Sequence, residues 1–173
     1  MPVSIDVQQV KGKLIMATAT LTRPNDTTAY AAGDVVSNSA SATTPLALPL
    51  ARVEGGSGYL VAARLSTSKK SITPRMRVHL FNASDPTLAA DNAAWKELFA
   101  DASKRLGYFD LPAMSTAADT TNSNMARALD LALRIPFVAA AAALNLYAVL
   151  ETLDAFTPDA NQQYSLTILA DVD

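Results

Sequence analysis

The chain has 173 residues, half of them hydrophobic and 17% charged, a composition that suits one packed domain rather than a disordered chain. Its formal net charge of −2 leaves no positive excess to neutralise a run of phosphates, which disfavours sequence-independent binding of nucleic acid. Cysteine is absent, so disulfides and thiolate metal sites are excluded. The longest apolar stretch, at 135–150, is shorter than the ~18 to 20 uninterrupted residues of a membrane span, so we expect a soluble protein.

The first part of the chain predicts short strands separated by polar turns. Residues 13–22 are rich in β-branched and small side chains, and they end at the turn signal Arg-Pro-Asn-Asp of residues 23–26. A short β-branched strand at 35–36 then runs into the polar residues 37–44, which we interpret as a loop.

The segment from 45 to 67 predicts two strands on either side of the glycine-rich residues 55–58. Pro45 and Pro49 place the first strand at a sheet edge, because proline cannot donate a hydrogen bond to a ladder. The second strand alternates between two faces. One face is predicted to carry Tyr59, Val61, Ala63 and Leu65, and the other Arg64 and Ser66.

The clearest half-buried strand begins after Pro74. Its alternation predicts a core face of Met76, Val78 and Leu80 and an opposite face of Arg75, Arg77 and His79. His79 is the only histidine, and we expect it on an exposed strand face or at a subunit contact. No Gly-x-Ser-x-Gly motif marks a nucleophile for it, and one histidine without cysteine does not suit the metal site of a cupin.

Residues 91–106 predict one amphipathic α-helix. Asp91 or Asn92 can cap its start, and Gly107 provides a stop signal. We interpret Trp95 as a core residue on the apolar face of this helix. The side chains at helical spacing are Trp95, Leu98, Phe99, Ala102 and Leu106.

Propensities conflict in residues 125–153. Ala, Leu, Arg and Glu favour a helix, whereas Pro136 would interrupt one. We interpret the segment as strands, with a helix as the alternative; the alanines at 139–143 leave the conformation of 139–153 open. A turn at 158–161 is expected to separate the last two strands, the second of which presents one face made of Tyr164, Leu166 and Ile168.

Together these patterns give about eight short strands and one helix. They predict a mainly β protein, a jelly-roll-like antiparallel β-sandwich with one short inserted α-helix. We expect a single domain at 13–173, preceded by an N-terminal arm at 1–12.

Residue types that carry chemistry are sparse and scattered. The three glutamates, Glu54, Glu97 and Glu151, fall in different predicted elements, so a hydrolase that uses scattered Asp and Glu is the last-ranked alternative. We therefore expect no catalytic, cofactor-binding or metal-binding residue, no small-molecule substrate and no enzymatic activity. One basic cluster is a solvated face or, as an alternative, a docking surface for an acidic partner. It contains Lys69, Lys70, Arg75 and Arg77.

Several stretches resemble, in the same order, small structural proteins of tailed bacteriophages. They are LTRPNDTTAYAAGDVVSN at 21–38, GSGYLVAARLSTS at 56–68, RMRVHLFNASDPT at 75–87, DNAAW at 91–95, GYFDLPAM at 107–114 and the C-terminal stretch at 135–169. The resemblance covers roughly residues 13–170. It implies a virion structural protein, a capsid cement (decoration) protein with a jelly-roll-like fold on the capsid surface. Such proteins bind the major capsid protein of the same phage, often as homotrimers, and brace neighbouring subunits, with no nucleic-acid or membrane partner.

The cement interpretation predicts where contacts lie. The polar loops 37–44 and 115–124 and the arm 1–12 are the expected intersubunit or capsid contacts, because interactions are often carried by loops. An alternative of a different class is a tail or neck module that binds a receptor or a carbohydrate. That alternative requires exposed aromatic side chains, for which Tyr30 and Tyr59 are the candidates.

Overall fold

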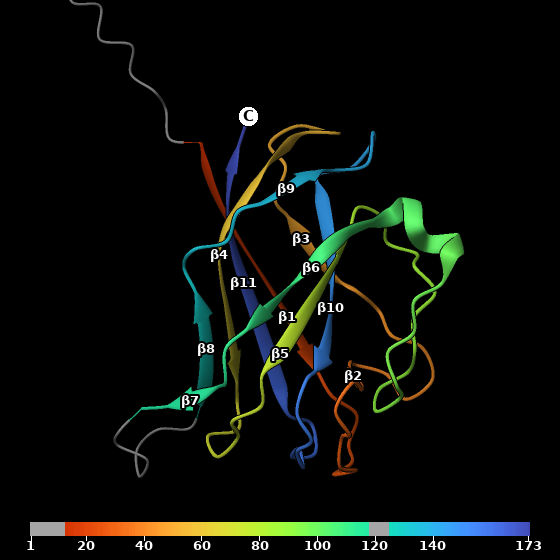
Figure 1. The fold of residues 1–173 in the computed structure, drawn as a ribbon, viewed down its shortest axis with the longest axis vertical. Helices are drawn as coiled ribbons and strands as arrows, with labels where there is room; N and C mark the ends of the chain where they lie inside the picture. The colour runs from red at the N-terminus through yellow and green to blue at the C-terminus, as the bar shows by residue number, and fades with distance from the viewer. Residues whose placement is uncertain (1–12, 118–124) are drawn as a thin grey trace, which may run out of the picture.

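A computed structural model describes residues 13–117 and 125–173 and shows two antiparallel β-sheets packed face to face (Figure 1). The β11 sheet contains, in spatial order, β1 (Leu14–Thr22), β11 (Gln163–Val172), β4 (Ser57–Thr67), β8 (Ala126–Asp130) and β7 (Ser115–Thr116), with β9 (Ile135–Val138) also paired to β4. The β10 sheet contains β2 (Val35–Val36), β10 (Asn145–Thr152), β5 (Met76–Phe81) and β6 (Arg105–Leu111), with β3 (Leu46–Pro49) also paired to β10.

The prediction of a mainly β antiparallel sandwich is confirmed. The expected strands at 13–22 and 35–36 are β1 and β2, and the strand expected before the glycine-rich residues 55–58 is β3. The polar stretch 37–44 is a loop, as predicted. Across the described ranges, no helix has the length and apolar character needed to cross a membrane.

Two of the edge strands are each interrupted by a loop. β2 and β3 pair with successive stretches of β10 on the same side of that strand, and the loop 37–45 separates them. In the same way, β8 and β9 pair with successive stretches of β4, and residues 131–134 separate them. Each of these pairs therefore occupies the position of one long strand.

The core lies between the two sheets and is built from alternate residues of their strands. Because side chains of a strand alternate between its faces, each strand of a sandwich gives every second residue to the core. The predicted core faces of β5 and β11 are correct, since every one of their members is fully buried: Met76, Val78, Leu80, Tyr164, Leu166 and Ile168.

The alternation predicted for β4 holds in its second half and is wrong in its first. Ala63 and Leu65 face the core, and Arg64 faces away from it. Leu60, rather than Tyr59, is the buried residue near the start of the strand, and Tyr59 is 48% exposed. The register with β11 shifts at this point, so one extra residue reverses the alternation on either side of it.

The predicted α-helix at 91–106 is absent; the described chain has a short 3₁₀ helix, η1 (Phe99–Lys104), followed at once by β6. Asn92 has a positive φ of 59°, which a right-handed helix does not allow. The next residues use their backbone groups in sheet-like bonds to residues 33–35, so these groups are not available to a helix. Tertiary pairing overrides the helical spacing of the apolar side chains.

Residues 139–144 form a turn between β9 and β10. The alanine run is therefore neither strand nor helix, whereas the strand interpretation is correct for 145–152. Pro136 lies in β9, which pairs only with β4 among the described strands. A strand with one neighbour can contain proline, because the position of the missing N–H faces no second strand.

Candidate interaction surfaces

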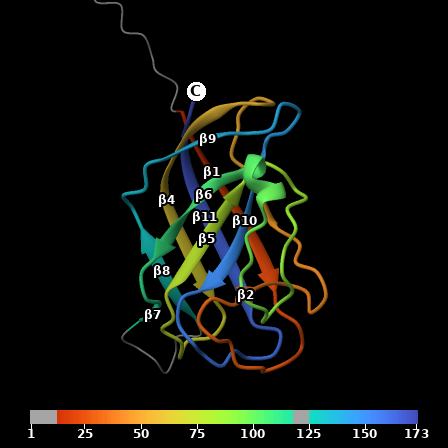
Figure 2. The same ribbon diagram turned by 45° about the vertical axis from the view of Figure 1, so that its right-hand side comes forward.

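Part of the outer face of the β10 sheet, around Phe81 and Val149, is covered by the chain's own segment 82–104 (Figure 2). The backbone of this segment is bonded to the region around β2: Trp95 N–H donates to the Gly33 carbonyl at 2.7 Å, and Ala93 accepts from Val35 N–H at 2.9 Å. Under it lies a small apolar cluster, separate from the main core, that contains Val35, Phe81, Ala89 and Val149. The protein itself therefore covers this part of the face, whereas Tyr108 on β6 remains 51% exposed.

His79 lies under the covering segment and is only 1% exposed. The Trp95 ring stacks on its imidazole, with the ring centroids 3.7 Å apart. Arg105 Nη2 donates to His79 Nδ1 at 3.2 Å, so the ring proton is on Nε2, which donates to Glu151 Oε2 at 2.6 Å. The expectation of an exposed His79 is wrong, because the segment that follows β5 folds back over the face on which the alternation places it.

The surroundings of His79 keep its imidazole neutral. Burial lowers the pKa of His79 to about 3, and the positive charges of Arg105 and Arg77 act in the same direction. Burial also raises the pKa of Glu151. Among described residues the polar and aromatic contacts of His79 come from Trp95, Tyr108, Arg105 and Glu151, a set without a nucleophilic serine. The arrangement joins the covering segment to the sheet.

The basic cluster predicted from the sequence is largely neutralised by carboxylates. Lys69 pairs with Asp159 at 2.8 Å. Arg75 makes two hydrogen bonds to Asp154, at 3.0 and 2.8 Å, and they lower the pKa of that carboxyl to about 2. Two more join Arg77 to Asp110, at 2.6 and 2.9 Å. Most positive charges of this cluster are therefore already paired within the protein. This argues against the alternative interpretation of the cluster as an open docking surface for an acidic partner.

The outer face of the β11 sheet is open over the part of the chain that the structure describes. Large apolar side chains are exposed on it: Met16 is 70% exposed and Leu129 is 45% exposed. A shallow hollow runs across the sheet from β1 to β8. Its lining includes Met16, Ala62, Arg64, Leu129, Thr167 and Leu169.

Two arginines extend from this open face without a carboxylate partner among the described residues. Arg64 projects from β4, and its one recorded side-chain bond is a long one of 3.5 Å to the Thr167 hydroxyl. Arg127 projects from β8 and is paired with Ser66 of β4. This pair lies two residues along the strands from the pair of Arg64 and Leu129 and is on the same face. The alternation in the sequence places Arg64 on this face correctly, but the absence of a nearby carboxylate becomes visible only in three dimensions.

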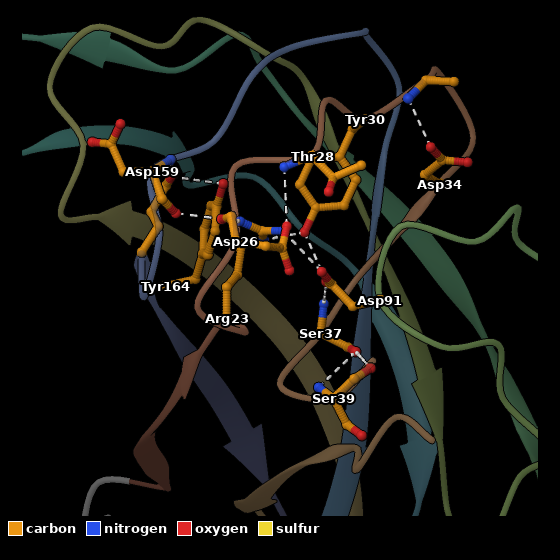
Figure 3. A network of polar contacts seen from close by, with 12 residues as sticks. Arg23, Asp26, Thr28, Tyr30, Asp34, Ser37, Ser39, Asp91, Asp159 and Tyr164 are labelled. Carbon is orange, nitrogen blue, oxygen red and sulfur yellow. Dashed lines mark hydrogen bonds and ion pairs between the residues drawn. The ribbon is translucent and has the colours of Figure 1, made fainter. Parts of the chain in front are cut away.

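A buried polar cluster holds one end of the sandwich together (Figure 3). The Arg23 side chain is fully buried, and its Nη2 pairs with Asp91 Oδ2 at 2.9 Å. Tyr30 accepts a hydrogen bond from Arg23 Nε and donates one to Asp91 Oδ1 at 2.7 Å. Ser37 N–H donates to the same Asp91 oxygen at 2.7 Å. Every partner is charged or strongly polar, so the buried charges are compensated.

The cluster explains the motif within the first stretch of the resemblance, residues 23–38 of 21–38. Arg23 also donates to the carbonyl groups of Asp26 and Asp159, at 3.3 and 3.2 Å, which ties this segment to the turn before β11. Figure 3 shows Arg23, Tyr30 and Ser37 converging on Asp91 from one continuous stretch of chain. The motif is therefore a clamp that fixes the loops at this end, and Asp91 is not a helix cap.

Some of the residues predicted to make contacts are buried in the structure, and others are exposed. Tyr30 is 2% exposed and is unavailable as a carbohydrate platform, whereas Tyr59 is exposed on the β11 sheet. In loop 37–44, Ser37 is buried in the clamp, and most of the following residues are exposed. The arm 1–12 and residues 118–124 of the loop 115–124 lie outside the described residues.

The scattered carboxylates do not converge. Glu54 lies in a turn, Glu97 pairs with Arg105, and Glu151 bonds to His79. Within 13–117 and 125–173, no group of three or more His, Cys, Asp or Glu side chains could hold a metal ion.

Comparison with family models gives no match, and no curated protein matches the chain. Among solved structures, the chain is similar to one described as the cyanophage Pam1 capsid asymmetric unit, with 11% identity and a TM-score of 0.36. The similarity covers 100% of this chain and 94% of that chain. A likeness at this level carries no argument about function.

Proposed function

We propose that this protein is a structural component of a bacteriophage virion, a capsid cement protein that binds the outer surface of the head and acts without catalysis. The proposal starts from the resemblance of residues 21–38, 56–68 and 75–87 to small phage structural proteins. On this proposal its partners are the major capsid subunits, and it stabilises the contacts between them.

The observation that carries the proposal is the difference between the two outer faces of the sandwich. The segment 82–104 covers part of the β10 sheet, whereas the β11 sheet exposes Met16 and Leu129 beside Arg64 and Arg127, which have no carboxylate partner within 13–117 and 125–173. Methionine and arginine are among the residues enriched at protein interfaces, and arginine recognises carboxylates through bidentate bonds. The open face therefore suits a protein surface that presents carboxylates among apolar side chains.

The order of the strands supports a jelly-roll fold for this scaffold. If β2 with β3 and β8 with β9 each count as one strand and the two-residue β7 is left out, the β11 sheet has the order 1-8-3-6 and the β10 sheet the order 2-7-4-5. Such interleaving of eight strands in two sheets is the jelly-roll arrangement, which occurs in viral capsid domains and also in lectins and cupins. The fold alone does not choose among these functions.

Repetition over a shell would make a modest contact effective. A specific interface buries about 1,600 Å² in total, and roughly half of that area lies on each partner. A cement protein that touches two neighbouring capsid subunits gains avidity, because the second contact forms at a high effective concentration. This mechanism requires only the surface chemistry of the open face.

Co-sedimentation with shells of the major capsid protein tests the proposal. The wild-type protein is expected to pellet with the shells, and the double charge reversal Arg64→Glu with Arg127→Glu is expected to lower its affinity at least tenfold. Lys96→Glu is the matched control, because Lys96 is exposed on the covering segment over the opposite sheet. Undiminished binding by the double variant would remove the open face from the interface, and failure of the wild type to pellet would reject the cement function.

A glycan-array screen separates the cement function from the tail or neck alternative. Carbohydrate binding that depends on the exposed Tyr59 would favour a receptor-binding module. We expect no glycan binding, and we expect Tyr59→Ala to leave shell binding within a few fold of wild type.

A further inference from the structure

We propose that β1 is a self-association strand: two copies of the protein pair their β1 strands antiparallel across a two-fold axis, so that the two β11 sheets become one continuous sheet. The inference concerns contacts between copies of this chain, and it holds whether or not the partner of the open face is a capsid subunit.

The first observation is which residues of β1 use their backbone groups to bond to β11. Val172 N–H donates to the Lys13 carbonyl, and Arg23 N–H donates to the Gln162 carbonyl, in a register that is uninterrupted from one end of β1 to the other. In an antiparallel pair, bonded positions alternate with non-bonded ones, so the odd-numbered residues of β1 bond to β11. The backbone N–H and C=O groups that point away from β11, toward the free edge, belong to Leu14, Met16, Thr18, Thr20 and Thr22.

The second observation is that β1 lacks the features that protect the edges of sheets. Edge strands are usually blunted by proline, charge, a bulge or short length, because a row of free donors and acceptors pairs readily with another chain. β1 is nine residues long and contains no charged residue, no proline and no register shift. Its five outward residues have no hydrogen-bond partner for their backbone groups within 13–117 and 125–173.

The other described edges all carry such a feature. Pro49 lies in the short β3, and Pro136 lies in β9. The β6 edge carries Arg105 and Asp110 and has a register shift opposite Leu80 and Phe81. β2 and β7 have only two residues each. β1 is therefore the one long, uncharged and regular edge in the described chain. It borders the open face, and β3 of the other sheet lies close to it without a backbone hydrogen bond to it among the described residues.

The sequence of β1 is compatible with pairing to itself. With Thr18 on the two-fold axis, Met16 lies opposite Thr20 of the second copy, and Leu14 lies opposite Thr22 of the second copy. All five outward-pointing residues then form bonded pairs, and no two like charges oppose each other along the strand. The hydroxyl rows already present, Thr18 with Thr167 at 2.9 Å and Thr20 with Ser165 at 3.2 Å, would continue from one copy into the other.

Cysteine cross-linking tests the register directly, since the chain contains no cysteine. In a bonded antiparallel pair the Cα atoms are about 5.5 Å apart, which is within the range that a disulfide spans. Under mild oxidation, Thr18→Cys is expected to give a covalent dimer, and an equimolar mixture of Met16→Cys and Thr20→Cys is expected to give the mixed dimer in preference to either self-dimer. Ser165→Cys, on the same face but in the central strand β11, is the control that should stay monomeric on a non-reducing gel.

Sedimentation of the full chain supplies the second measurement. The wild type is expected to sediment as a dimer, and Thr18→Lys, which places two ammonium groups at the axis, is expected to weaken dimerisation at least tenfold. Ser165→Lys should leave the dimer intact, and circular dichroism checks that both variants remain folded. A monomeric wild type, a trimer such as the family resemblance implies, or cross-linking without register preference would overturn the proposal. Loss of the dimer with retained shell binding would reject β1 pairing and leave the cement function standing.

Discussion

Arg23 and Asp91 are 68 residues apart in the chain and form a fully buried ion pair, with 2.9 Å between Nη2 and Oδ2. Removing one member of such a pair leaves the other charge buried without compensation, an effect of about 3 to 5 kcal/mol. We therefore expect Asp91→Ala to lower the free energy of unfolding by that amount in urea denaturation. Arg75→Ala, which breaks the exposed pair with Asp154, is the control and should change stability little. Equal losses in the two variants would contradict the importance of burial.

Tyr30 bridges the same two side chains through its hydroxyl group. The oxygen accepts from Arg23 Nε and donates to Asp91 Oδ1, and the ring stacks on Phe156 with centroids 4.9 Å apart. Tyr30→Phe keeps the ring and removes only the hydroxyl, so a buried donor loses its partner. We expect a loss of about 1 to 3 kcal/mol in the free energy of unfolding. Tyr59→Phe, at an exposed tyrosine on the β11 sheet, should be neutral in the same denaturation experiment.

Gly58 lies where β4 approaches the backbone of β11. A Cβ atom at this position would lie 2.3 Å from the Asp171 carbonyl oxygen and 3.0 Å from Val172 Cα. Both are backbone atoms, so the strands themselves must move, and we expect Gly58→Ala to destabilise the protein by about 1 to 3 kcal/mol. Faster amide exchange at Val172, measured by NMR, would locate the damage. Ser57→Ala, one residue earlier and partly exposed, is the matched control and should stay within about 0.5 kcal/mol of wild type.

Local periodicity predicts most of the strands because each strand of a sandwich buries one face. Met76, Val78 and Leu80 show this alternation in the sequence and are fully buried in the structure. The same rule fails at Tyr59, because a register shift adds one residue and nothing in the local sequence marks it. The outline of the fold therefore follows from the sequence, whereas irregularities depend on the neighbouring strand.

The features that organise the site depend on contacts between distant segments. Helical spacing at Trp95 is real in the sequence, but the backbone there bonds to residues 33–35 and the ring covers His79. Arg23 looks like part of a surface turn until Asp91 is placed beside it. No rule of local spacing predicts the bonding of Trp95 to Gly33 or the pairing of Arg23 with Asp91, since each joins segments more than fifty residues apart. The open face likewise cannot be predicted from the sequence, because the sequence does not reveal which sheet the segment 82–104 packs against.

The neutral, buried His79 makes stability depend on pH between neutral and mildly acidic conditions. Burial lowers the pKa of His79 to about 3 from an ordinary value of 6.5, so the unfolded chain takes up a proton below pH 6.5 and the folded protein does not. Stability that is present at neutral pH is therefore lost as the pH falls, by up to about 2 kcal/mol between pH 7 and pH 5. Glu151 opposes this trend, because its raised pKa favours the folded state on the acidic side.

Urea denaturation at pH 7 and pH 5 measures the effect of His79 in isolation from most carboxylates. The lowered pKa values of Asp110 and Asp154 place their contributions below pH 5, so they leave this interval largely unaffected. His79→Gln keeps a polar side chain under Trp95 but does not titrate, and we expect its stability to differ little between the two pH values. Glu151→Gln retains the histidine and should show a steeper loss than wild type. A wild-type protein that is equally stable at pH 7 and pH 5 would contradict a neutral His79 held by Arg105 and Glu151.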